Sequence, residues 1–351
     1  MDIEIERRIS RLRHRLGHDV SVVAHYYAPE GVRRFADEIG DSLQLAQVAS
    51  RNRTARHLIF CGVRFMAETA SLLAGTERNV YLPRPEAGCP LADCARIDDV
   101  EGAWQLLGDI SGDTIPITYV NSSTELKAFC GERDGATCTS SSAMDVFRAV
   151  LKTGARIFFF PDRNLGANTA RMLAVEPANV VTFDPATRRF LGDRSPEDAR
   201  VILWRGSCPV HTQYSPKDVI AVRREGHTRV AVHPECDPGI CEMADEMGST
   251  AHMVRAVARS DSAVRWAVGT ETNLVDHMKK LYPDRVIEDL GSPRVCRDMH
   301  IMAADDLLDT LQDIIKGRPE RKVDLSDSLR PGALTALQNM FAIVEGGGSP
   351  W

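Results

Sequence analysis

Three cysteines stand at matching places along the chain, each after the third strand of a predicted α/β unit. They are Cys89, Cys208 and Cys296. From His25 to Cys89 is 64 residues, and from His233 to Cys296 is 63 residues. Three thiolates from separate units suit a 4Fe–4S cluster that lacks one protein ligand, because full ligation uses four cysteines. The open iron would be a Lewis acid for dehydration chemistry, whereas the opposing interpretation makes all three ordinary buried thiols.

The number and spacing of all the cysteines limit the kinds of site that they can form. The chain has 351 residues and nine cysteines, and an odd number argues against a disulfide framework. No CxxC pair occurs, which disfavours a zinc ribbon. Cys94 is a second candidate beside Cys89, and the spacing of Cys236 and Cys241 is only a weak metal signal. We therefore expect the cysteines to be either structural thiols or ligands of a shared metal centre.

Polar side chains follow the first strand of each predicted unit. Open α/β sheets bind ligands at the carboxyl ends of their strands, so side chains placed there in three units are candidates for one pocket. Hydrogen-bonding groups in this number suit a small, oxygen-rich, anionic substrate. The side chains are those of His25, Tyr27, Tyr119, Asn121, His233 and Glu235, and His211, three residues after Cys208, is a seventh.

Hydroxyl residues form a third group of candidates. Ser42 and Thr250 each lie 17 residues after the histidine of their unit, and Ser140 lies in a serine-rich stretch of the middle unit. A helix N-terminus offers free N–H groups and a favourable dipole to a carboxylate or phosphate. Plain N-capping would account for the same residues, and the two interpretations are compatible.

The elements that must position these groups alternate between strand and helix along the whole chain. Such alternation predicts α/β units with short parallel sheets. The strands fall into three groups of three. We therefore predict three similar three-layer α/β/α units with short parallel sheets in a pseudo-threefold arrangement, with boundaries at 1–105, 106–216 and 217–351. The predicted strands are Val20–Tyr26, His57–Val63, Asn79–Pro83, Ile115–Val120, Arg156–Pro161, Val201–Arg205, Arg229–His233, Val264–Gly269 and Arg285–Ile287.

An internal repeat supports this division. Eleven residues after His25 and after His233 come two nearly identical stretches, ADEIGDS at 36–42 and ADEMGST at 244–250. Apolar residues up to each stretch recur at i, i+3, i+4 and i+7, which predicts a helix that ends at the glycine of the stretch. The hydroxyl residue two positions after that glycine is expected to cap the next helix.

The units differ at their ends and in the middle. The first is expected to begin with an amphipathic helix over residues 1–18, and the third to end in a helix and a loosely attached tail over 346–351. Cys208 follows Tyr119 by 89 residues, which is longer than the other two intervals. The excess predicts an insertion that includes residues 185–199.

Composition excludes several classes of function. The chain is 43% apolar and 26% charged, with a formal net charge of −6, and no strong basic patch suggests nucleic acid as a partner. No targeting segment and no apolar run long enough to span a membrane is visible, so we expect a cytoplasmic protein without a membrane partner. Neither a Walker A loop nor a GxGxxG fingerprint occurs.

These stretches together resemble the quinolinate synthase family of de novo NAD biosynthesis. The resemblance covers roughly residues 20–315, in order, and its motifs are unusual rather than generic marks of a fold. The matching pieces are AHYY at 24–27, ADEIGDSLQLA at 36–46, FCGVRFMAETA at 60–70, EAGCPLA at 86–92, TYVNSS at 118–123, CTSSSA at 138–143, FFPDRNLG at 159–166, LWRGSCPVH at 203–211, HPEC at 233–236, ADEMGST at 244–250, GTE at 269–271 and CRDM at 296–299.

The resemblance implies an enzyme with three α/β domains around one 4Fe–4S cluster per chain, held by Cys89, Cys208 and Cys296. It implies condensation of iminoaspartate with dihydroxyacetone phosphate to quinolinate, phosphate and water. Because the imine is reactive, it also implies delivery from an L-aspartate oxidase or dehydrogenase. The implied substrate pocket consists of His25, Tyr27, Ser42, Tyr119, Asn121, Ser140, His211, His233, Glu235, Ser249 and Thr250.

Within this pocket four residues are expected to take part in catalysis. Glu235 is the candidate general base or acid, and Tyr27 and Tyr119 can move protons or hold the substrate. His233 is expected to orient carbonyl or carboxylate oxygens. The alternatives are a non-catalytic iron–sulfur sensor of oxygen or iron, which would not need these polar groups, and a cluster-free sugar-phosphate aldolase or isomerase.

Overall fold

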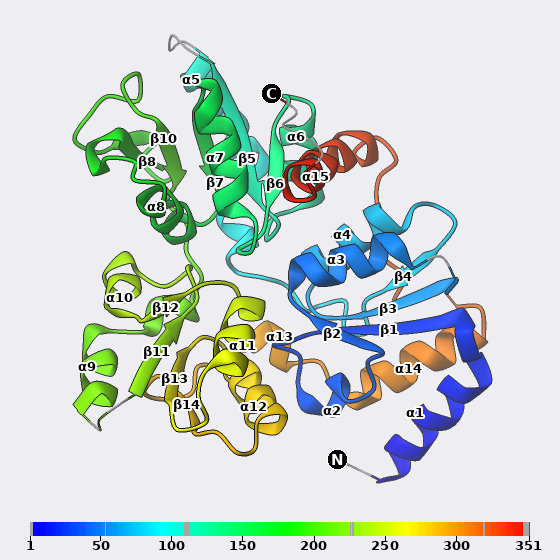
Figure 1. Cartoon of the computed structure of the whole chain (residues 1–351). Coiled ribbons are helices and arrows are strands. Elements are labelled where there is room, and N and C mark those ends of the chain that lie inside the picture. The colour runs from blue at the N-terminus through cyan, green and yellow to red at the C-terminus, as the bar shows by residue number, and fades with distance from the viewer. Residues whose placement is uncertain are drawn as a thin grey trace. The chain divides into compact units, whose positions relative to one another are not determined.

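The computed structural model describes residues 3–52, 54–108, 113–224, 226, 228–318, 320–346 and 351. They form two compact bodies, each described by itself (Figure 1). The first body draws on Met1–Cys89, Glu271–Pro283 and Pro293–Ser326, and the second on Pro90–Thr270, Asp284–Ser292 and Asp327–Trp351. None of the described helices has both the length and the apolar composition that a bilayer-spanning segment needs.

The first body is built on a sheet of four parallel strands in the order β2-β1-β3-β4. The central strands are β1 (Val20–His25) and β3 (His57–Cys61), and β1 is buried throughout, as expected for a parallel strand covered on both faces. The edge strands are β2 (Glu38–Gly40) and β4 (Asn79–Tyr81).

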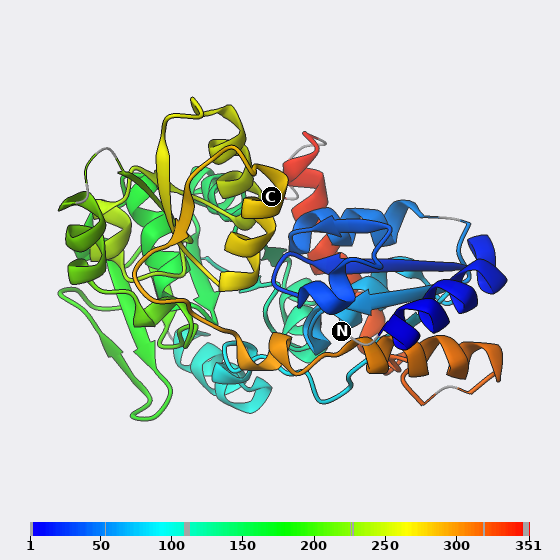
Figure 2. The ribbon, with the colours of Figure 1, turned by 90° about the horizontal axis from the view of Figure 1, so that it is seen from below.

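Seven helices of the first body are described. Helix α1 packs against α14, and the two lie side by side in Figures 1 and 2. The helices are α1 (Ile3–Leu16), α2 (Glu30–Arg33), α3 (Ser42–Arg51), α4 (Arg64–Ala74), α12 (Thr272–Leu281), α13 (Arg297–His300) and α14 (Ala304–Ile315), with the 3-10 helix η1 (Gly17–Asp19) before β1.

The second sheet lies in the second body and has the order β6-β5-β7-β10-β8-β9, in which only β8 and β9 pair antiparallel. Residues of β7 point alternately to two covered faces. Phe158 and Phe160 pack in one apolar cluster with Trp204 and with helices α5 and α6, whereas Phe159 packs on Phe147 of α7, with ring centroids 5.1 Å apart. This sheet is therefore the middle layer of three.

The bounds of these elements are as follows. The strands are β5 (Thr114–Tyr119), β6 (Ala136–Cys138), β7 (Arg156–Phe160), β8 (Val180–Asp184), β9 (Arg189–Leu191) and β10 (Val201–Trp204). The helices are α5 (Ile97–Gly108), α6 (Thr124–Gly131), α7 (Ala143–Thr153), α8 (Arg163–Met172) and α15 (Arg330–Val344), with η2 (Ala92–Cys94), η3 (Pro177–Asn179) and η4 (His211–Gln213).

The third sheet has four parallel strands in the order β12-β11-β13-β14. Its core contains Val230 and Val232 of β11, Ala267 of β13 and apolar residues of helices α9 and α10, and Trp266 of β13 is also fully buried. The elements are β11 (Thr228–Val232), β12 (Glu246–Met247), β13 (Arg265–Gly269), β14 (Ile287–Asp289), α9 (Pro216–Arg224), α10 (Pro238–Met243) and α11 (Thr250–Arg259).

The predicted fold class is confirmed: the chain is α/β, with short and mostly parallel sheets layered with helices. The strand order of the first sheet recurs in the third, and the four strands β6-β5-β7-β10 repeat it in the second. The predicted middle insertion corresponds to the extra hairpin β8–β9, which projects in green in Figure 2. The unit boundaries and the arrangement around a central cluster stay predictions.

The predicted helices ending at Gly40 and Gly248 are wrong. Each repeated stretch instead forms a short edge strand, β2 or β12, after a helix that ends several residues earlier. The aspartate before each strand explains the repeat. Asp37 exchanges two hydrogen bonds with the backbone of Val22, at 2.7 and 2.8 Å, and Asp245 does the same with Val230, at 2.9 and 2.8 Å.

The predicted helix caps are also displaced by one residue. The side chain that accepts the N-capping hydrogen bond of α3 is Asp41, from the N–H of Gln44 at 2.9 Å. In α11 the cap is Ser249, which accepts from the N–H of His252 at 3.3 Å. Ser42 and Thr250 are thus the first residues of their helices.

Two further helices, α14 and α15, follow the third sheet in the chain. Helix α14 contacts α1 and α2, and α15 contacts α6, α7 and β6 of the second sheet. Gly131 permits close approach there, because a Cβ at this position would lie 1.9 Å from the carbonyl oxygen of Gly332. Most of the predicted loose tail, residues 347–350, lies outside the described residues, and Trp351 donates from Nε1 to the carbonyl of Asp134 at 2.6 Å.

Candidate active site

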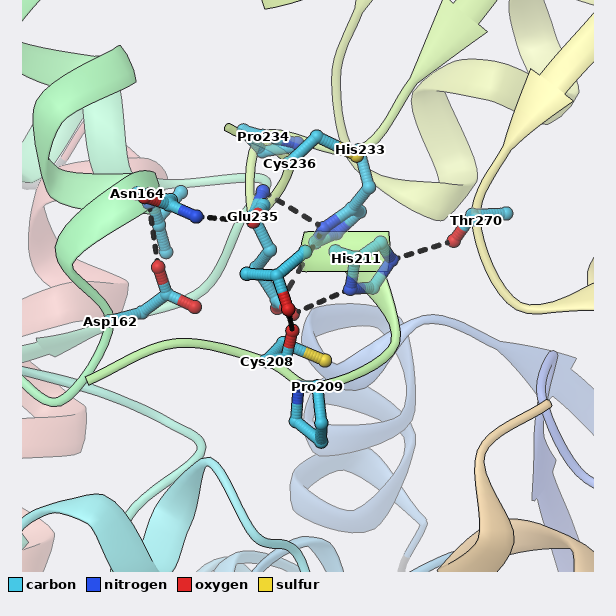
Figure 3. Close-up of polar contacts among 12 residues, drawn as sticks. Asp162, Asn164, Cys208, Pro209, His211, His233, Pro234, Glu235, Cys236 and Thr270 are labelled. Carbon is cyan, nitrogen blue, oxygen red and sulfur yellow. Dashed lines mark hydrogen bonds and ion pairs between the residues drawn. The ribbon is translucent and has the colours of Figure 1, made fainter. Parts of the chain in front are cut away.

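Four predicted site residues form one group in the second body, centred on the carboxylate of Glu235, and Figure 3 labels three of them, His211, His233 and Glu235. Tyr119 donates its hydroxyl proton to Oε1 of Glu235 at 2.7 Å, and Nδ1 of His211 lies 2.9 Å from Oε2. Nδ1 of His233 lies 3.7 Å from Oε1, and the His233 ring stacks on the His211 ring with centroids 4.7 Å apart. Three distant segments of the sequence therefore converge on one carboxylate.

The ends of three strands place these side chains. Tyr119 is the last residue of β5, and His233 directly follows β11. The N–H of Cys236 donates to the carbonyl of His233 at 3.0 Å, which closes a turn that carries Glu235. His211 begins η4, in the loop that follows β10. All three strands present their carboxyl ends to the site, as the rule for open α/β sheets predicts.

Burial sets the protonation states in this group. Burial and the neighbouring Glu235 carboxylate raise the pKa of Tyr119 well above its usual value, so the phenol keeps its proton. Burial lowers the pKa of His233 to about 3, so its imidazole is neutral at pH 7. Burial opposes ionisation of Glu235, but the hydrogen bonds that its carboxylate accepts from His211 and Tyr119 favour the ionised form, and the pKa of Glu235 is lowered. The group is an ionised carboxylate beside a phenol and a neutral imidazole.

A candidate metal centre overlaps this group. Cys208, His211 and Glu235 each offer one ligand atom, and these atoms all lie within 4.8 Å of one another. Figure 3 shows Cys208 next to the Glu235 carboxylate. Thiolate, imidazole and carboxylate are all established ligands of protein-bound metals. The predicted ligand Cys208 thus lies beside the predicted catalytic residues.

The accessibility of the cysteines separates the three predicted ligands and Cys94 from the other five. Cys89, Cys208 and Cys296 are partly exposed, Cys94 is exposed, and the other five are buried thiols. Burial raises the pKa of Cys61 to about 12, and that of Cys296 to about 11, so a thiolate at position 296 needs a bound metal to hold it. The donor set fits a metal centre, since all three thiol side chains are partly exposed.

Two of these cysteines belong to the first body, where their segments are neighbours. A Cβ on Gly88 would lie 3.5 Å from Oδ1 of Asp298, so the loop before Cys89 approaches the turn after Cys296. The N–H of Cys296 donates to Oε1 of Glu271 at 3.4 Å. Whether Cys89, Cys208 and Cys296 share one cluster stays a prediction.

The first body repeats part of the Glu235 group. The N–H of Tyr27 donates to Nδ1 of His25 at 3.1 Å, and the N–H of Glu235 donates to Nδ1 of His233 at 3.4 Å. In both sheets a histidine after the first strand accepts a backbone N–H from two residues further on. The Tyr27 and His25 rings meet edge to face, with centroids 4.7 Å apart. Tyr27 therefore occupies the place in the first sheet that Glu235 has in the third.

The predicted hydroxyl and amide residues are placed as follows. A cavity of about 310 Å³ in the second body is lined by Ser140, Ser249 and Pro234, with Arg255 also on its wall. Ser140 also hydrogen-bonds Tyr119, which connects this cavity to the Glu235 group. Ser42 and Thr250 begin α3 and α11. Oδ1 of Asn121 is buried without a hydrogen-bond partner among the described residues, as a ligand-binding amide would be.

Sequence reasoning missed three buried groups that contact the site. Nε2 of His211 lies 3.0 Å from Oγ1 of Thr270, and Nδ2 of Asn164 donates to the carbonyl of Glu235 at 3.1 Å. Asn168, one helical turn later, contacts the same turn. The signal for the asparagines was available: Asp162 is an N-capping residue after β7, so a helix carrying Asn164 and Asn168 on one face could have been expected.

Comparisons with known proteins identify the family of the chain. Residues 7–342 match the family model described as NadA, quinolinate synthetase A protein. A quinolinate synthase of Bacillus velezensis (strain DSM 23117 / BGSC 10A6 / LMG 26770 / FZB42) is 40% identical over 342 residues, covering 97% of this chain and 93% of that protein. A quinolinate synthase of Bacillus subtilis (strain 168) is 38% identical over 343 residues, which cover 97% of this chain and 93% of that protein. One of Listeria innocua is 39% identical over 344 residues, with 97% and 94% covered.

Proposed function

Because this chain belongs to the quinolinate synthetase A protein family, we propose that it is a quinolinate synthase that condenses iminoaspartate with dihydroxyacetone phosphate, releasing phosphate and water. The observation that carries the proposal is the buried group of Tyr119, His211, His233 and Glu235 beside the partly exposed Cys208. Such a group can move protons next to a metal centre, and a structural core has no need of it.

Cys89, Cys208 and Cys296 would hold a 4Fe–4S cluster, one per chain. When bound, the cluster supplies an open iron that acts as a Lewis acid toward substrate oxygens. Three cysteines leave one iron without a protein thiolate. The partial exposure of the same three sulfurs supports this choice of ligands.

The chain's own residues would handle the protons and hold the substrates. Glu235 is ionised and can accept a proton at its carboxylate, and Tyr119, whose hydroxyl donates to that carboxylate, can pass its proton to the substrate while it takes the proton from Glu235. His233 stays neutral, so it can donate or accept a hydrogen bond without repelling a cationic intermediate. Tyr27, the counterpart of Glu235 in the first sheet, is a further candidate for proton transfer.

Anion binding is the second task, since both proposed substrates carry acidic groups. Ser140 and Ser249 line the cavity next to Tyr119, and His25, Ser42, Asn121 and Thr250 complete the proposed pocket. Backbone N–H groups at the starts of α3 and α11 add donors for carboxylate or phosphate. Delivery of the imine by an L-aspartate oxidase or dehydrogenase, and a cytoplasmic location, stay predictions.

The test is an anaerobic assay for quinolinate, with iron and sulfide counted on the same sample. Replacing Cys89, Cys208 or Cys296 by Ser should abolish both the iron–sulfur absorption and quinolinate formation. Cys130→Ser is the control, because Cys130 is fully buried in the core of the second sheet and should keep both. An iron-loaded wild-type protein without quinolinate formation would favour a sensor, and an active protein without iron would favour a metal-independent reaction.

A further inference from the structure

Helix α8 of the second sheet faces the turn that carries His233 and Glu235. Asn164 and Asn168 are four residues apart, so they lie on one face of α8, and both are fully buried. Buried polar side chains are usually hydrogen-bonded, so each of these amides is expected to have specific partners. Neither residue contacts the Glu235 carboxylate, and the proposed function does not use them.

Their amide groups bind three successive carbonyl oxygens of the turn. Nδ2 of Asn164 donates to the carbonyl of Glu235 at 3.1 Å. Nδ2 of Asn168 donates to the carbonyls of Pro234 and Cys236, at 2.8 and 3.0 Å, and also lies 3.3 Å from Sγ of Cys241. Most of the donors to these carbonyls thus come from α8; the thiol of Cys241 also donates to the carbonyl of Cys236, at 3.6 Å.

The orientation of both amides follows from their surroundings. The guanidinium of Arg163 donates to Oδ1 of Asn164 at 3.0 and 3.3 Å, which turns Nδ2 toward Glu235. Oδ1 of Asn168 is buried without a partner among the described residues, whereas its Nδ2 is surrounded by acceptors. The side-chain N–H groups of Asn168 therefore form its contacts with the turn, because an acceptor at the same place would face other acceptors.

We infer that Asn164 and Asn168 are positioning residues that hold the 233–236 turn, and with it the Glu235 carboxylate, in the geometry that reacts. The inference rests on the proposed function. The contacts of Glu235 with Tyr119 and His211, at 2.7 and 2.9 Å, both depend on where this turn places the carboxylate. A shift of about 1 Å in such a group can lower the rate by about 100-fold.

Gly166 fixes the position of α8 on the second sheet. A Cβ on Gly166, between the two asparagines, would lie 2.4 Å from Cδ2 of Leu203 and 2.6 Å from Cδ1 of Phe159. The missing side chain lets α8 pack directly on β7 and β10. The second sheet, which carries Tyr119, is thereby connected through α8 to the turn that carries Glu235.

The experiment compares Asn164→Ala, Asn168→Ala and Asn168→Asp in the anaerobic quinolinate assay. We expect kcat to fall about 10-fold or more in each alanine variant, with KM within about 3-fold of wild type and unchanged iron and sulfide. Asn168→Asp, which keeps the size of the side chain but replaces its donors, should fall at least as far as Asn168→Ala. The pH profile of kcat/KM should also shift, because the surroundings of Glu235 change.

Asn339→Ala is the matched control. Its Nδ2 donates to the carbonyl of Gly135 at 2.8 Å and so connects α15 to the second sheet by the same kind of bond, far along the chain from the site. It should lose a comparable amount of thermal stability but keep the wild-type kcat and pH profile. If the Asn164 and Asn168 variants lower Tm as Asn339→Ala does and keep kcat and the pH profile, the inference is wrong. If wild-type protein makes no quinolinate, the proposed function itself has failed.

Discussion

The carboxylate of Glu235 is buried, yet its environment favours the ionised form. Oε1 accepts from Tyr119, and Oε2 lies next to His211, which in turn contacts Thr270. A buried carboxylate with donors on both oxygens is well placed to accept a proton when a substrate displaces one of them. Glutamate at this position therefore contributes its charge, not only its shape.

Glu235→Gln tests that distinction. The amide has nearly the same size and can keep the contact with Tyr119, so the fold and iron content should be retained, whereas kcat should fall about 100-fold or more. The measurement is quinolinate formation per iron-loaded protein. Glu288→Gln is the control, because Glu288 is an exposed residue paired with Arg265 at 3.4 Å and should leave turnover unchanged. Wild-type turnover in Glu235→Gln would remove this carboxylate from the mechanism.

The buried histidines predict how stability depends on pH. Burial lowers the pKa of His233 to about 3 and that of His277 to about 4, whereas an unfolded histidine takes up its proton near pH 6.5. The unfolded chain therefore binds more protons between about pH 4 and 6.5, and stability is lost as the pH falls through this window. Each histidine contributes a slope of at most about 1.4 kcal/mol per pH unit.

Urea unfolding of metal-free protein at several pH values checks this expectation. Replacing His233 or His277 by Gln should flatten the loss of stability between pH 6.5 and 4. The two variants should differ in activity, because His277 packs at a tilt against Tyr26 of the first body, with ring centroids 5.6 Å apart, and its loss should leave turnover intact. An unchanged slope in both variants would mean that other groups control the acid transition.

At the scale of elements, the strands were predictable and their edges were not. All nine predicted strands exist to within a few residues, because buried parallel strands are continuous apolar runs with clear ends. Five strands were missed: β2, β6, β8, β9 and β12. β2 and β12 have only three and two residues and follow short helices. The apolar residues of each short helix and of the strand after it have the spacing expected of one longer helix. Only the pairing of Asp37 and Asp245 with neighbouring backbone distinguishes the two, and pairing is not visible in one sequence.

The residues of the candidate site also include some that could be predicted and some that could not. Residues at the ends of first strands, such as Tyr119 and His233, could be predicted because topology alone brings strand ends to one edge. Asn164 and Asn168 could not be assigned a role, because their partners are backbone carbonyls of another sheet. Side chains that act on backbone leave no matching residue type in the sequence.

Helix α8 supplies a prediction at this scale. Gly166→Ala should push the helix off β7 and β10, because the added methyl group would overlap Leu203 and Phe159. Overpacking of this kind destabilises by about 1–3 kcal/mol, and the displaced asparagines should lower kcat in addition. Thermal unfolding and the quinolinate assay measure the two effects. Gly108→Ala is the control, since a Cβ there meets nothing within 4 Å, and equal behaviour of the two variants would contradict the close fit.

At the scale of the whole chain, the net charge does not favour the binding of anionic substrates. The formal net charge of −6 repels anionic substrates, so positive groups at the cavity are needed to attract them. Arg255 lines the cavity with Ser140 and Ser249 and is exposed to solvent. It is therefore a candidate for steering acidic substrates toward the pocket.

Arg255→Gln should raise KM several-fold with little change in kcat, and it should weaken the dependence of kcat/KM on ionic strength. Steady-state kinetics at low and high salt provide the measurement. Arg259→Gln removes the same charge one turn later on α11, outside the cavity, and should have little effect. Equal effects of both substitutions would point to net charge alone.

The distribution of tryptophan gives the two bodies different optical signatures. All four tryptophans, at positions 104, 204, 266 and 351, belong to the second body, and Trp204 and Trp266 are fully buried in its two sheets. Tryptophan fluorescence, excited selectively, therefore reports on the second body alone, whereas circular dichroism reports on both. If the first body unfolds at lower denaturant, ellipticity will fall before the emission maximum moves to longer wavelength, and a coincident change would show that the two bodies unfold as one cooperative unit.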